Sequence, residues 1–566
     1  MQKTYNKYFN SDNLKLAYFR VLCWPDRTVK DQVGLRAFGK NIDENCQNFS
    51  QKILQGEYQP KRGFKYYMPK ASGTTRTKTL LDVEDALIYQ AIANVIAQDS
   101  YDLLSENDEF VFGSVLLPEV KKGVDIMQEE EPNYFFFKFW KQLYQKFKNS
   151  VIKSIEVDKV KYKFETDITG FFDCIPHYNL LNKLSERFHV EDEILDLLAN
   201  CLNTWSGTKE SVTPGVGIPQ GPLPSFFLAN LLLHDLDDML VGKGLKYYRY
   251  MDDMKIYGYE ENDLQRALVE IDMYLKGNGL SINSKKTSIL EIDENTEDET
   301  VREMRKIEVF SLYDEEDVEL EESTSITKES HSLACQDQDD SFFVHPSIVT
   351  LSDEIEIEKF HLEQLQEVST ELPALFNESP DSDLNLKQGV EDLDFLRLSV
   401  KFSQSIKGLK QINKNTEADT ALLKYWLFAY QKFFWRANNF GFTLSLYGDS
   451  FLVREKLLHF IKNKFDMFEW NRYYAIQTLS FNHKFTDKEL RQIFFEMLIN
   501  ETSDLAKISL YRLLFKHSTN KQFLSTLKKQ LQKENSLYLK ILIADFNKYN
   551  SSEDLDFVEF LNFIGI

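Results

Sequence analysis

Two adjacent carboxylates, Asp252 and Asp253, interrupt a run of aromatic and apolar residues in the stretch YYRYMDDMKIYG. Like charges side by side repel, and burying them without a counter-charge costs on the order of several kcal/mol. One interpretation is a tight turn between two strands, with exposed aspartates at its tip. The other is a hairpin whose tip binds a divalent cation, because the cation would supply the missing positive charge.

A third carboxylate and a glycine-rich loop favour the cation. Asp167 ends a predicted strand in KYKFETDITGFF, and Gly221 in GIPQGPLPS precedes a strongly apolar predicted helix. If the Asp167 strand pairs with the hairpin strands, three carboxylates converge at one end of a sheet. Phosphoryl transfer uses such a set to bind two Mg²⁺ ions roughly 3.5–4 Å apart. The predicted chemistry is therefore metal-dependent phosphoryl transfer.

The elements that must position these residues follow from the hydropathy pattern. Strand-like alternation ends at Asp167, and a strand–turn–strand surrounds Asp252. Aromatic residues within 118–155 recur at helical spacing and predict a packed amphipathic helix, and a further helix is predicted over 263–277. The pattern predicts an α+β core in which helices pack on a small antiparallel sheet.

Five collinear stretches resemble the motifs of reverse transcriptases. MPKASGTTR resembles the fingers segment, and FETDITGFFDCIPH, GIPQGPLPSFFLAN, YMDD and GLSINSKKT resemble motifs A, B, C and D in that order. The resemblance covers residues 50–290, about half the chain. It implies a right-hand polymerase core of fingers and palm, with Mg²⁺ as cofactor and dNTPs as substrates.

The resemblance also assigns site residues position by position. It implies that the catalytic residues are Asp167, Asp252, Asp253 and Lys286, with Lys285 as the competitor of Lys286. The implied metal ligands are the same three aspartates and the carbonyl of Ile168. The implied dNTP-binding residues are Lys70, Arg76, Phe172, Gln220 and Gly221.

Phe172 is relevant to whether the enzyme uses deoxynucleotides or ribonucleotides. Reverse transcriptases carry an aromatic residue five positions after the motif A aspartate, where it collides with a 2′-hydroxyl. Asp173 comes one residue later, and strand alternation is expected to turn it away from the nucleotide. The resemblance therefore implies deoxynucleotides, although a plain core aromatic is the alternative for Phe172.

Charge and composition divide the chain of 566 residues. Its net charge is −22, yet residues 291–394 alone hold 32 acidic and 6 basic residues, whereas residues 395–566 hold 17 acidic and 25 basic residues. The acidic segment is Ser-rich and poor in periodicity, so we expect a partly disordered linker. The predicted domains are an N-terminal and fingers region over 1–115, a palm over 116–290, the linker over 291–394 and an α-helical domain over 395–566.

The last predicted domain favours one branch of the reverse transcriptases. One amphipathic helix follows another beyond residue 395, which predicts HEAT-like paired helices in the position of the thumb. This layout is similar to the abortive-infection (Abi) branch of bacterial defence enzymes. That resemblance implies antiphage defence, priming on a protein hydroxyl, a single-stranded DNA product and a homo-oligomer.

Several alternatives stay open. Synthesis copies a bound RNA template, or it runs without a template; the alternative of another class is an idle nucleic-acid-binding scaffold. Arg512 and His517 have the spacing of a HEPN-type ribonuclease, but a basic pair on a helix face is the favoured interpretation. Five scattered cysteines, a polar start and no long apolar stretch predict a cytoplasmic protein without a membrane segment.

Overall fold

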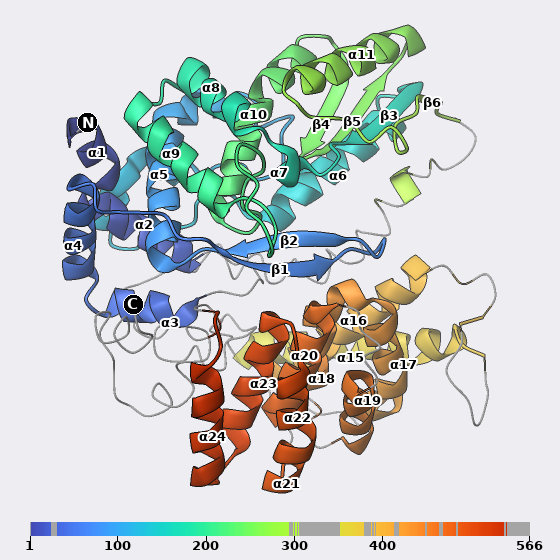
Figure 1. The fold of residues 1–566 in the computed structure, drawn as a ribbon. Helices are drawn as coiled ribbons and strands as arrows, with labels where there is room; N and C mark the ends of the chain where they lie inside the picture. The colour runs from blue at the N-terminus through green and yellow to red at the C-terminus, as the bar shows by residue number, and fades with distance from the viewer. Residues whose placement is uncertain are drawn as a thin grey trace.

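The protein is described from a computed structural model in which helices predominate and two small antiparallel sheets occur (Figure 1). The mixed helix-and-sheet class expected from the hydropathy pattern is thus confirmed. The structure describes residues 2–23, 31–293, 298, 300–302, 304, 351–377, 386–387, 390, 392–411, 418–445, 447, 450–462, 468–482, 485–536 and 539.

The first part of the chain consists of five helices and one β-hairpin. The helices are α1 Gln2–Phe9, α2 Ser11–Cys23, α3 Gln32–Lys40, α4 Ile42–Leu54 and α5 Val83–Ser105, and the hairpin pairs β1 Phe64–Pro69 with β2 Thr75–Leu80. Helix α5 begins where the Asp82 side chain accepts a hydrogen bond from the Asp85 amide at 3.0 Å. Apolar residues on several sides of α5 are buried in the first hydrophobic core.

A four-stranded antiparallel sheet follows, in the order β4-β5-β3-β6. Its strands are β3 Tyr162–Asp167, β4 Lys246–Tyr250, β5 Asp253–Gly258 and β6 Leu290–Glu291. The helices around it are η1 Pro118–Gln128, α6 Trp140–Glu156, α7 Phe171–Cys174, α8 His177–Phe188, α9 Asp192–Trp205, α10 Leu223–Val241 and α11 Glu261–Gly277. The helix predicted over 263–277 is therefore present, two residues longer at its start.

Different helices pack on the two faces of this sheet. Phe164, Met254 and Ile256 point to one face and join the core built by α10 and α11. Tyr248 and Tyr257 point to the other face, where they pack with α6. Because side chains alternate along a strand, the pairing register decides which face each polar residue occupies.

The aromatic stretch within 118–155 departs from the prediction of one helix. Helix α6 begins only at Trp140, and the preceding residues are extended, with Phe137 bridged to Leu116. Pro132 and Asn133 lie in this stretch and disfavour a continuous helix. Several of the aromatic side chains are nevertheless buried, as expected, and Phe136 packs edge-on against Phe227 of α10, whereas Trp140 is exposed.

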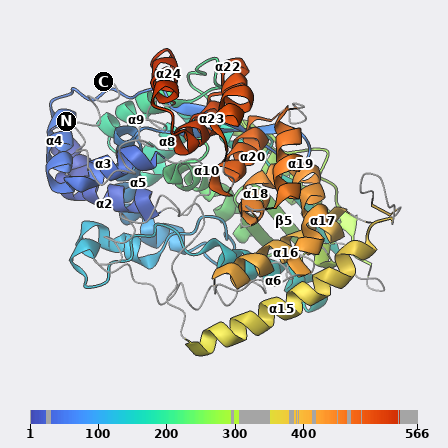
Figure 2. The ribbon, with the colours of Figure 1, turned by 90° about the horizontal axis from the view of Figure 1, so that it is seen from below.

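The remaining described helices form a C-terminal unit with a core of its own. They are α15 Leu351–Ala374, α16 Asp392–Gln411, α17 Ala418–Lys432, η2 Phe434–Arg436, α18 Ala437–Ser445, α19 Phe451–Lys462, α20 Glu469–Asn482, α21 Asp487–Glu489, the π-helical turn η3 Leu490–Phe495, α22 Glu496–Asn500, α23 Asp504–His517 and α24 Lys521–Gln532. Figure 2 shows the long helix α15 at the outer edge of this unit, beside α16.

The C-terminal unit shares its core with the β1–β2 hairpin. Phe64 and Tyr66 of β1 are buried in the same cluster as Leu365 of α15 and Trp470 of α20. Figure 1 shows the hairpin between the helices of the first part and those of the C-terminal unit. The hairpin is thus a structural link between the two.

Part of the predicted linker is ordered structure. Helix α15 occupies residues 351–374 and buries Leu365, Val368 and Leu372 against the C-terminal unit. At the other end of the segment, Val301 and Met304 are buried under the palm sheet. The expected disorder concerns mainly residues 305–350, which lie outside the described residues. Within the part of the chain that is described, no helix has the length and apolarity needed to span a bilayer.

Candidate active site

The strand register brings two of the predicted catalytic carboxylates together. In the antiparallel pair of β3 and β5, Asp167 lies opposite Asp253. Directly opposite residues of an antiparallel pair point to the same face, so both side chains lie on the face that carries Glu165 and Lys255. Asp252 lies in the two-residue turn between β4 and β5, beside the end of β3. The three carboxylates therefore converge at one end of the sheet, as expected.

The turn that presents Asp252 is conformationally strained. Met251 has φ of 56°, in the left-handed region that residues with a Cβ rarely adopt. Its side chain is 9% exposed, so packing holds the residue in this conformation. Backbone strain of this kind is common in turns that place a functional side chain.

The electrostatics of the two hairpin aspartates oppose full ionisation. Burial raises the pKa of Asp252; the charge of Asp167 adds to the rise, while Arg76 and Lys286 oppose it. Burial also raises the pKa of Asp253 to about 6, with Lys255 opposing. The neighbouring cations thus do not offset the effect of burial, and the pKa of both carboxylates stays raised.

Asp167 provides the test of whether a cation fits. Its Oδ1 is buried and accepts no hydrogen bond within the described structure. Lys286 Nζ lies 3.4 Å from it, but the lysine side chain is 68% exposed, and exposed pairs contribute about 0–1 kcal/mol. An unsatisfied carboxylate oxygen beside two further carboxylates is a donor set that suits Mg²⁺.

A second group of metal-type ligands lies elsewhere, on α10. Among the described residues, His234, Asp235 and Asp238 are the set whose ligand atoms all lie within 4.8 Å of one another. Asp167, Asp252 and Asp253 are not so closely spaced. The α10 carboxylates already have cationic partners, however, because Asp235 pairs with Lys183 and Asp238 with Arg187. This neutralisation disfavours a metal ion at the α10 group.

The loop that carries Lys286 is fastened to the end of β3. The Asn283 amide donates to the Asp167 carbonyl at 2.8 Å, and the Thr169 amide donates to the Ser281 carbonyl at 2.9 Å. The carbonyl of Ile168 takes no part in these two bonds. Lys286 reaches Asp167, whereas no contact of Lys285 with the site is observed among the described residues. The geometry thus favours Lys286 over Lys285.

The β1–β2 hairpin carries the two predicted triphosphate-binding residues. Lys70 begins the turn at the tip, where its amide donates to the Thr74 carbonyl at 2.7 Å. Arg76 lies on β2 opposite Met68, and its side chain is exposed. The charge of Arg76 lowers the pKa of Asp252, in keeping with a guanidinium near the carboxylate site.

Gln220 and Gly221 connect the apolar helix α10 with the hairpin. The Gln220 carbonyl accepts a hydrogen bond from the Thr79 amide of β2 at 2.8 Å. Gly221 has φ of 136°, and a Cβ added there would lie 2.9 Å from the Thr79 carbonyl oxygen. Only glycine fits this close backbone approach without displacing β2.

Phe172 belongs to α7 and packs against α10. Its ring packs 5.3 Å from Phe226 and 5.7 Å from Phe171, and it is 8% exposed. The Asp173 side chain is largely exposed; partial desolvation raises its pKa, and the charges of Lys70 and Lys65 oppose the rise. Strand alternation did not anticipate this placement, because residues 171–174 are a helical turn.

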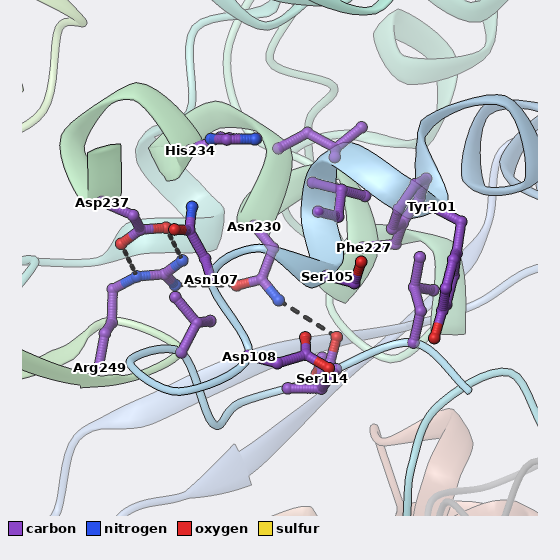
Figure 3. A pocket seen from close by; sticks show the side chains of 15 residues that line it. Tyr101, Ser105, Asn107, Asp108, Ser114, Phe227, Asn230, His234, Asp237 and Arg249 are labelled. Carbon is purple, nitrogen blue, oxygen red and sulfur yellow. Dashed lines mark hydrogen bonds and ion pairs between the residues drawn. The ribbon is translucent and has the colours of Figure 1, made fainter. Parts of the chain in front are cut away.

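Arg249 is a buried residue that contacts the turn carrying Asp252. The resemblance to reverse transcriptase motifs did not single it out. Arg249 is 1% exposed and forms a bidentate ion pair with Asp237 of α10, Nε to Oδ1 at 2.7 Å (Figure 3). Its Nη1 donates to Asn230 Oδ1 at 2.8 Å and to the Met251 carbonyl at 2.9 Å. The signal in the sequence was a charged residue at a core-facing position of YYRYMDD.

The comparison with protein families decides the class of this site. Residues 68–321 match the family described as reverse transcriptase (RNA-dependent DNA polymerase). The chain carries a reverse transcriptase domain. The domain is of the nucleotidyltransferase class, which confirms the enzyme class predicted from the five motifs. The matched range runs past residue 290, in agreement with the buried Val301 and Met304.

Similar solved structures include telomerases. Apo telomerase from Candida tropicalis, truncated from its C-terminal domain, aligns with a TM-score of 0.30 at 12% identity, over 44% of this chain and 55% of that chain. Telomerase from Candida albicans in complex with the TWJ fragment of telomeric RNA aligns with a TM-score of 0.32 at 10% identity, over 85% and 65%. The chain spans between about half and two thirds of the length of these two telomerases. No curated protein sequence matches the chain.

Arg512 and His517 do not form a free basic pair. His517 lies against Phe485 and its Nε2 is 2.8 Å from the Ser480 carbonyl, while Arg512 hydrogen-bonds Tyr473. Burial lowers the pKa of His517, so the ring is neutral at physiological pH. These contacts favour a structural role for both residues over a ribonuclease site.

Proposed function

We propose that the protein is a DNA polymerase that transfers nucleotides from dNTPs, with Asp167, Asp252 and Asp253 as its catalytic carboxylates. The observation that supports this best is the register that sets Asp167 opposite Asp253, with Asp252 in the adjoining turn. Arg76 and Lys286 face the same site and supply positive charge for a triphosphate. The three carboxylates, Lys70, Arg76, Gln220 and Lys286 are all present in the sequence, which disfavours an idle scaffold.

The three carboxylates and the Ile168 carbonyl would hold Mg²⁺. When bound, the metal would lower the pKa of the attacking hydroxyl and stabilise charge on the transferred phosphate. The chain's own residues bind and orient the substrate around it. Lys70 contacts the phosphates as a point charge, and Arg76 contacts them as a planar fork.

The other substrate contacts follow from their positions. Gly221 allows the backbone to approach the nucleotide, and Gln220 lies at the junction between α10 and the hairpin. Lys286, exposed and next to Asp167, is placed to donate a proton to the departing pyrophosphate. Lys286→Gln should therefore slow catalysis more than it weakens dNTP binding.

Phe172 is proposed as the residue that excludes a 2′-hydroxyl. Its ring lies beside Phe226 at the junction of α7 and α10, where motifs A and B meet. Phe172→Val should open space and let ribonucleotides enter. Asp173→Ala is the matched control, because it alters the next residue without removing the ring. An unchanged preference for dNTPs in Phe172→Val would assign Phe172 to the core alone.

The finer assignments rest on the similarity to the Abi branch. We propose that the C-terminal unit is a HEAT-like array that replaces the thumb, with Lys432 and Arg436 beside a channel for single-stranded DNA product. We also propose antiphage defence, a cytoplasmic location and a homo-oligomer. Priming on a protein hydroxyl and copying of an RNA template give different products: DNA attached to protein, or DNA complementary to an RNA.

The deciding experiment is incorporation of labelled dNTPs by the purified chain with Mg²⁺. We expect incorporation by the wild type and none by a variant carrying Asp252→Asn and Asp253→Asn. Sequencing of DNA that copurifies with the protein separates templated from untemplated synthesis. A wild-type chain that incorporates no dNTP with or without added RNA would contradict the proposed function.

A further inference from the structure

A side chain of the C-terminal unit closes the free edge of the fingers hairpin. Glu469, the first residue of α20, accepts a hydrogen bond at Oε1 from the Tyr67 backbone amide of β1 at 2.6 Å. Its Oε2 accepts hydrogen bonds from Lys209 Nζ and from Ser503 Oγ. The Glu469 side chain is 7% exposed, so Lys209 rather than water balances its charge.

Aromatic packing strengthens this attachment. Trp470 follows Glu469 and stacks on Tyr66 of β1, with ring centroids 6.0 Å apart and planes inclined by 3°. Both rings are 1% exposed. The carboxylate of Glu469 thus contacts the edge of β1, while the neighbouring indole covers its face.

The loop before motif B joins the same cluster. Lys209 Nζ also lies 5.1 Å from the centre of the Tyr67 ring. Arg62 Nη2 donates to the carbonyls of Thr208 and Lys209, at 3.1 and 2.6 Å. Fingers, palm loop and C-terminal unit therefore meet at Glu469, three regions far apart in the chain.

This cluster lies close, along β1, to the residues that face the nucleotide site. Tyr67 is three residues before Lys70 and lies opposite Thr77, the neighbour of Arg76. A two-stranded hairpin is marginally stable by itself, so its position depends on what packs against it. Arg76 lies on β2 opposite Met68, the residue that follows Tyr67.

We infer that Glu469 is a positioning residue, which fixes the β1–β2 hairpin so that Lys70 and Arg76 are in place for the triphosphate of an incoming dNTP. The inference rests on the proposed function, and it gives the C-terminal unit a part in substrate affinity. Loss of Glu469 leaves the catalytic carboxylates intact. The hairpin then moves more freely, and binding energy of the dNTP is used to order it.

The test compares four variants of the full-length chain with the wild-type chain. Glu469→Ala removes all three contacts, Glu469→Gln keeps an acceptor for the Tyr67 amide, and Lys209→Gln removes the ion pair from the palm side. Glu534→Ala is the control, because Glu534 is 11% exposed and pairs with Lys507 at 2.8 Å within the C-terminal unit, away from Glu469. The measurements are KM for dNTP, kcat, and hydrogen exchange of the amides of residues 64–80.

We expect Glu469→Ala to raise KM by about fivefold or more with kcat within about twofold of wild type, and to speed amide exchange over 64–80. Glu469→Gln should recover part of the loss, and Glu534→Ala should change neither quantity. If Glu469→Ala does not fold, Lys209→Gln carries the test, since it leaves the C-terminal unit unaltered.

The outcomes separate the inference from the proposed function. If the wild type incorporates no dNTP, the proposed function is wrong, and hydrogen exchange alone decides whether Glu469 holds the hairpin. If the wild type is active, an unchanged KM in folded Glu469→Ala overturns the inference. Unchanged exchange over 64–80 in both Glu469→Ala and Lys209→Gln overturns it as well.

Discussion

At the scale of single residues, the site contains charges that the fold alone does not neutralise. Burial and neighbouring carboxylates raise the pKa of Asp252 and Asp253, and an oxygen of Asp167 has no hydrogen bond within the described structure. Ionised carboxylates in such surroundings destabilise the folded state. A bound cation favours the ionised form of these carboxylates, so with the cation bound their ionisation stabilises the folded state.

Removing a charge from Asp253 should therefore stabilise the metal-free protein. Its folded pKa of about 6 lies above the unfolded value near 3.9, so ionisation lowers stability as pH rises from about 4 to 6. At pH 7 the difference corresponds to at most about 3 kcal/mol. Asp253→Asn should raise the urea midpoint in EDTA at pH 7 and lose the stabilisation that Mg²⁺ gives to wild type. A variant less stable than wild type in EDTA would contradict this.

The buried Lys65 predicts a second pH dependence of folding stability, opposite in sign to that of Asp253. Its side chain is 6% exposed, and burial lowers its pKa to about 8. The folded state therefore binds fewer protons than the unfolded state between pH 8 and 10.4, so this residue makes stability rise over that range by up to about 3 kcal/mol. Lys65→Met should lack this rise in urea titrations from pH 7.5 to 10. An equal rise in both proteins would show that Lys65 is not responsible.

At the scale of elements, the hairpin of β4 and β5 depends on helix α10. Arg249 spans from Asp237 and Asn230 of α10 to the carbonyl of Met251, the residue with positive φ before Asp252. This buried network links motif B to motif C. The turn that carries Asp252 is thus held by the buried ion pair of Arg249 and Asp237.

Arg249→Lys tests this link. A lysine retains the charge but cannot reach Asp237, Asn230 and the Met251 carbonyl together, so we expect a loss of about 1–3 kcal/mol in unfolding free energy. We also expect kcat to fall at least tenfold, because the Asp252 turn relaxes. Arg187→Lys is the control: Arg187 pairs with Asp238 of the same helix but is 41% exposed. Equal effects in the two variants would argue against a positioning role for Arg249.

Some of these elements could be predicted from the sequence, and others could not. The alternation in KYKFETD and the YMDD turn were sufficient to predict β3, the hairpin and the convergence of three aspartates. The pairing register that sets Asp167 opposite Asp253 depends on long-range contacts and was only a hypothesis. Glu469 was out of reach, because its partner in β1 lies 402 residues away and a lone glutamate at a helix start carries no signal of a binding partner.

At the scale of the whole molecule, the fingers and the C-terminal unit are not separable bodies. Phe64 and Tyr66 of β1 are core residues of the C-terminal unit, and Leu365 of the predicted linker belongs to the same core. The boundaries at 291 and 395 expected from charge therefore do not coincide with the boundaries of packing. The acidic composition extends over α15, but the apolar side chains of this helix are part of the core of the C-terminal unit.

Truncation after residue 394 should consequently do more than delete a domain. It leaves Phe64 and Tyr66 uncovered and removes Glu469 from the edge of β1, so we expect no dNTP incorporation and self-association through the exposed hairpin. Light scattering and incorporation assays on the full and truncated chains provide the measurement. A truncated chain that does not self-associate beyond the assembly state of the full chain, and that incorporates dNTP as well as the full chain, would contradict this.

The shared core also constrains how the chain is made in the cell. The fingers hairpin leaves the ribosome early, but Trp470 and Glu469, which cover it, are translated about 400 residues later. At about 5–20 residues per second, β1 waits roughly 20–80 s for its cover. During that time an apolar strand edge is open to other nascent chains. We therefore expect co-expression of a chaperone that binds exposed apolar segments to raise the yield of folded protein, and an unchanged yield would contradict this.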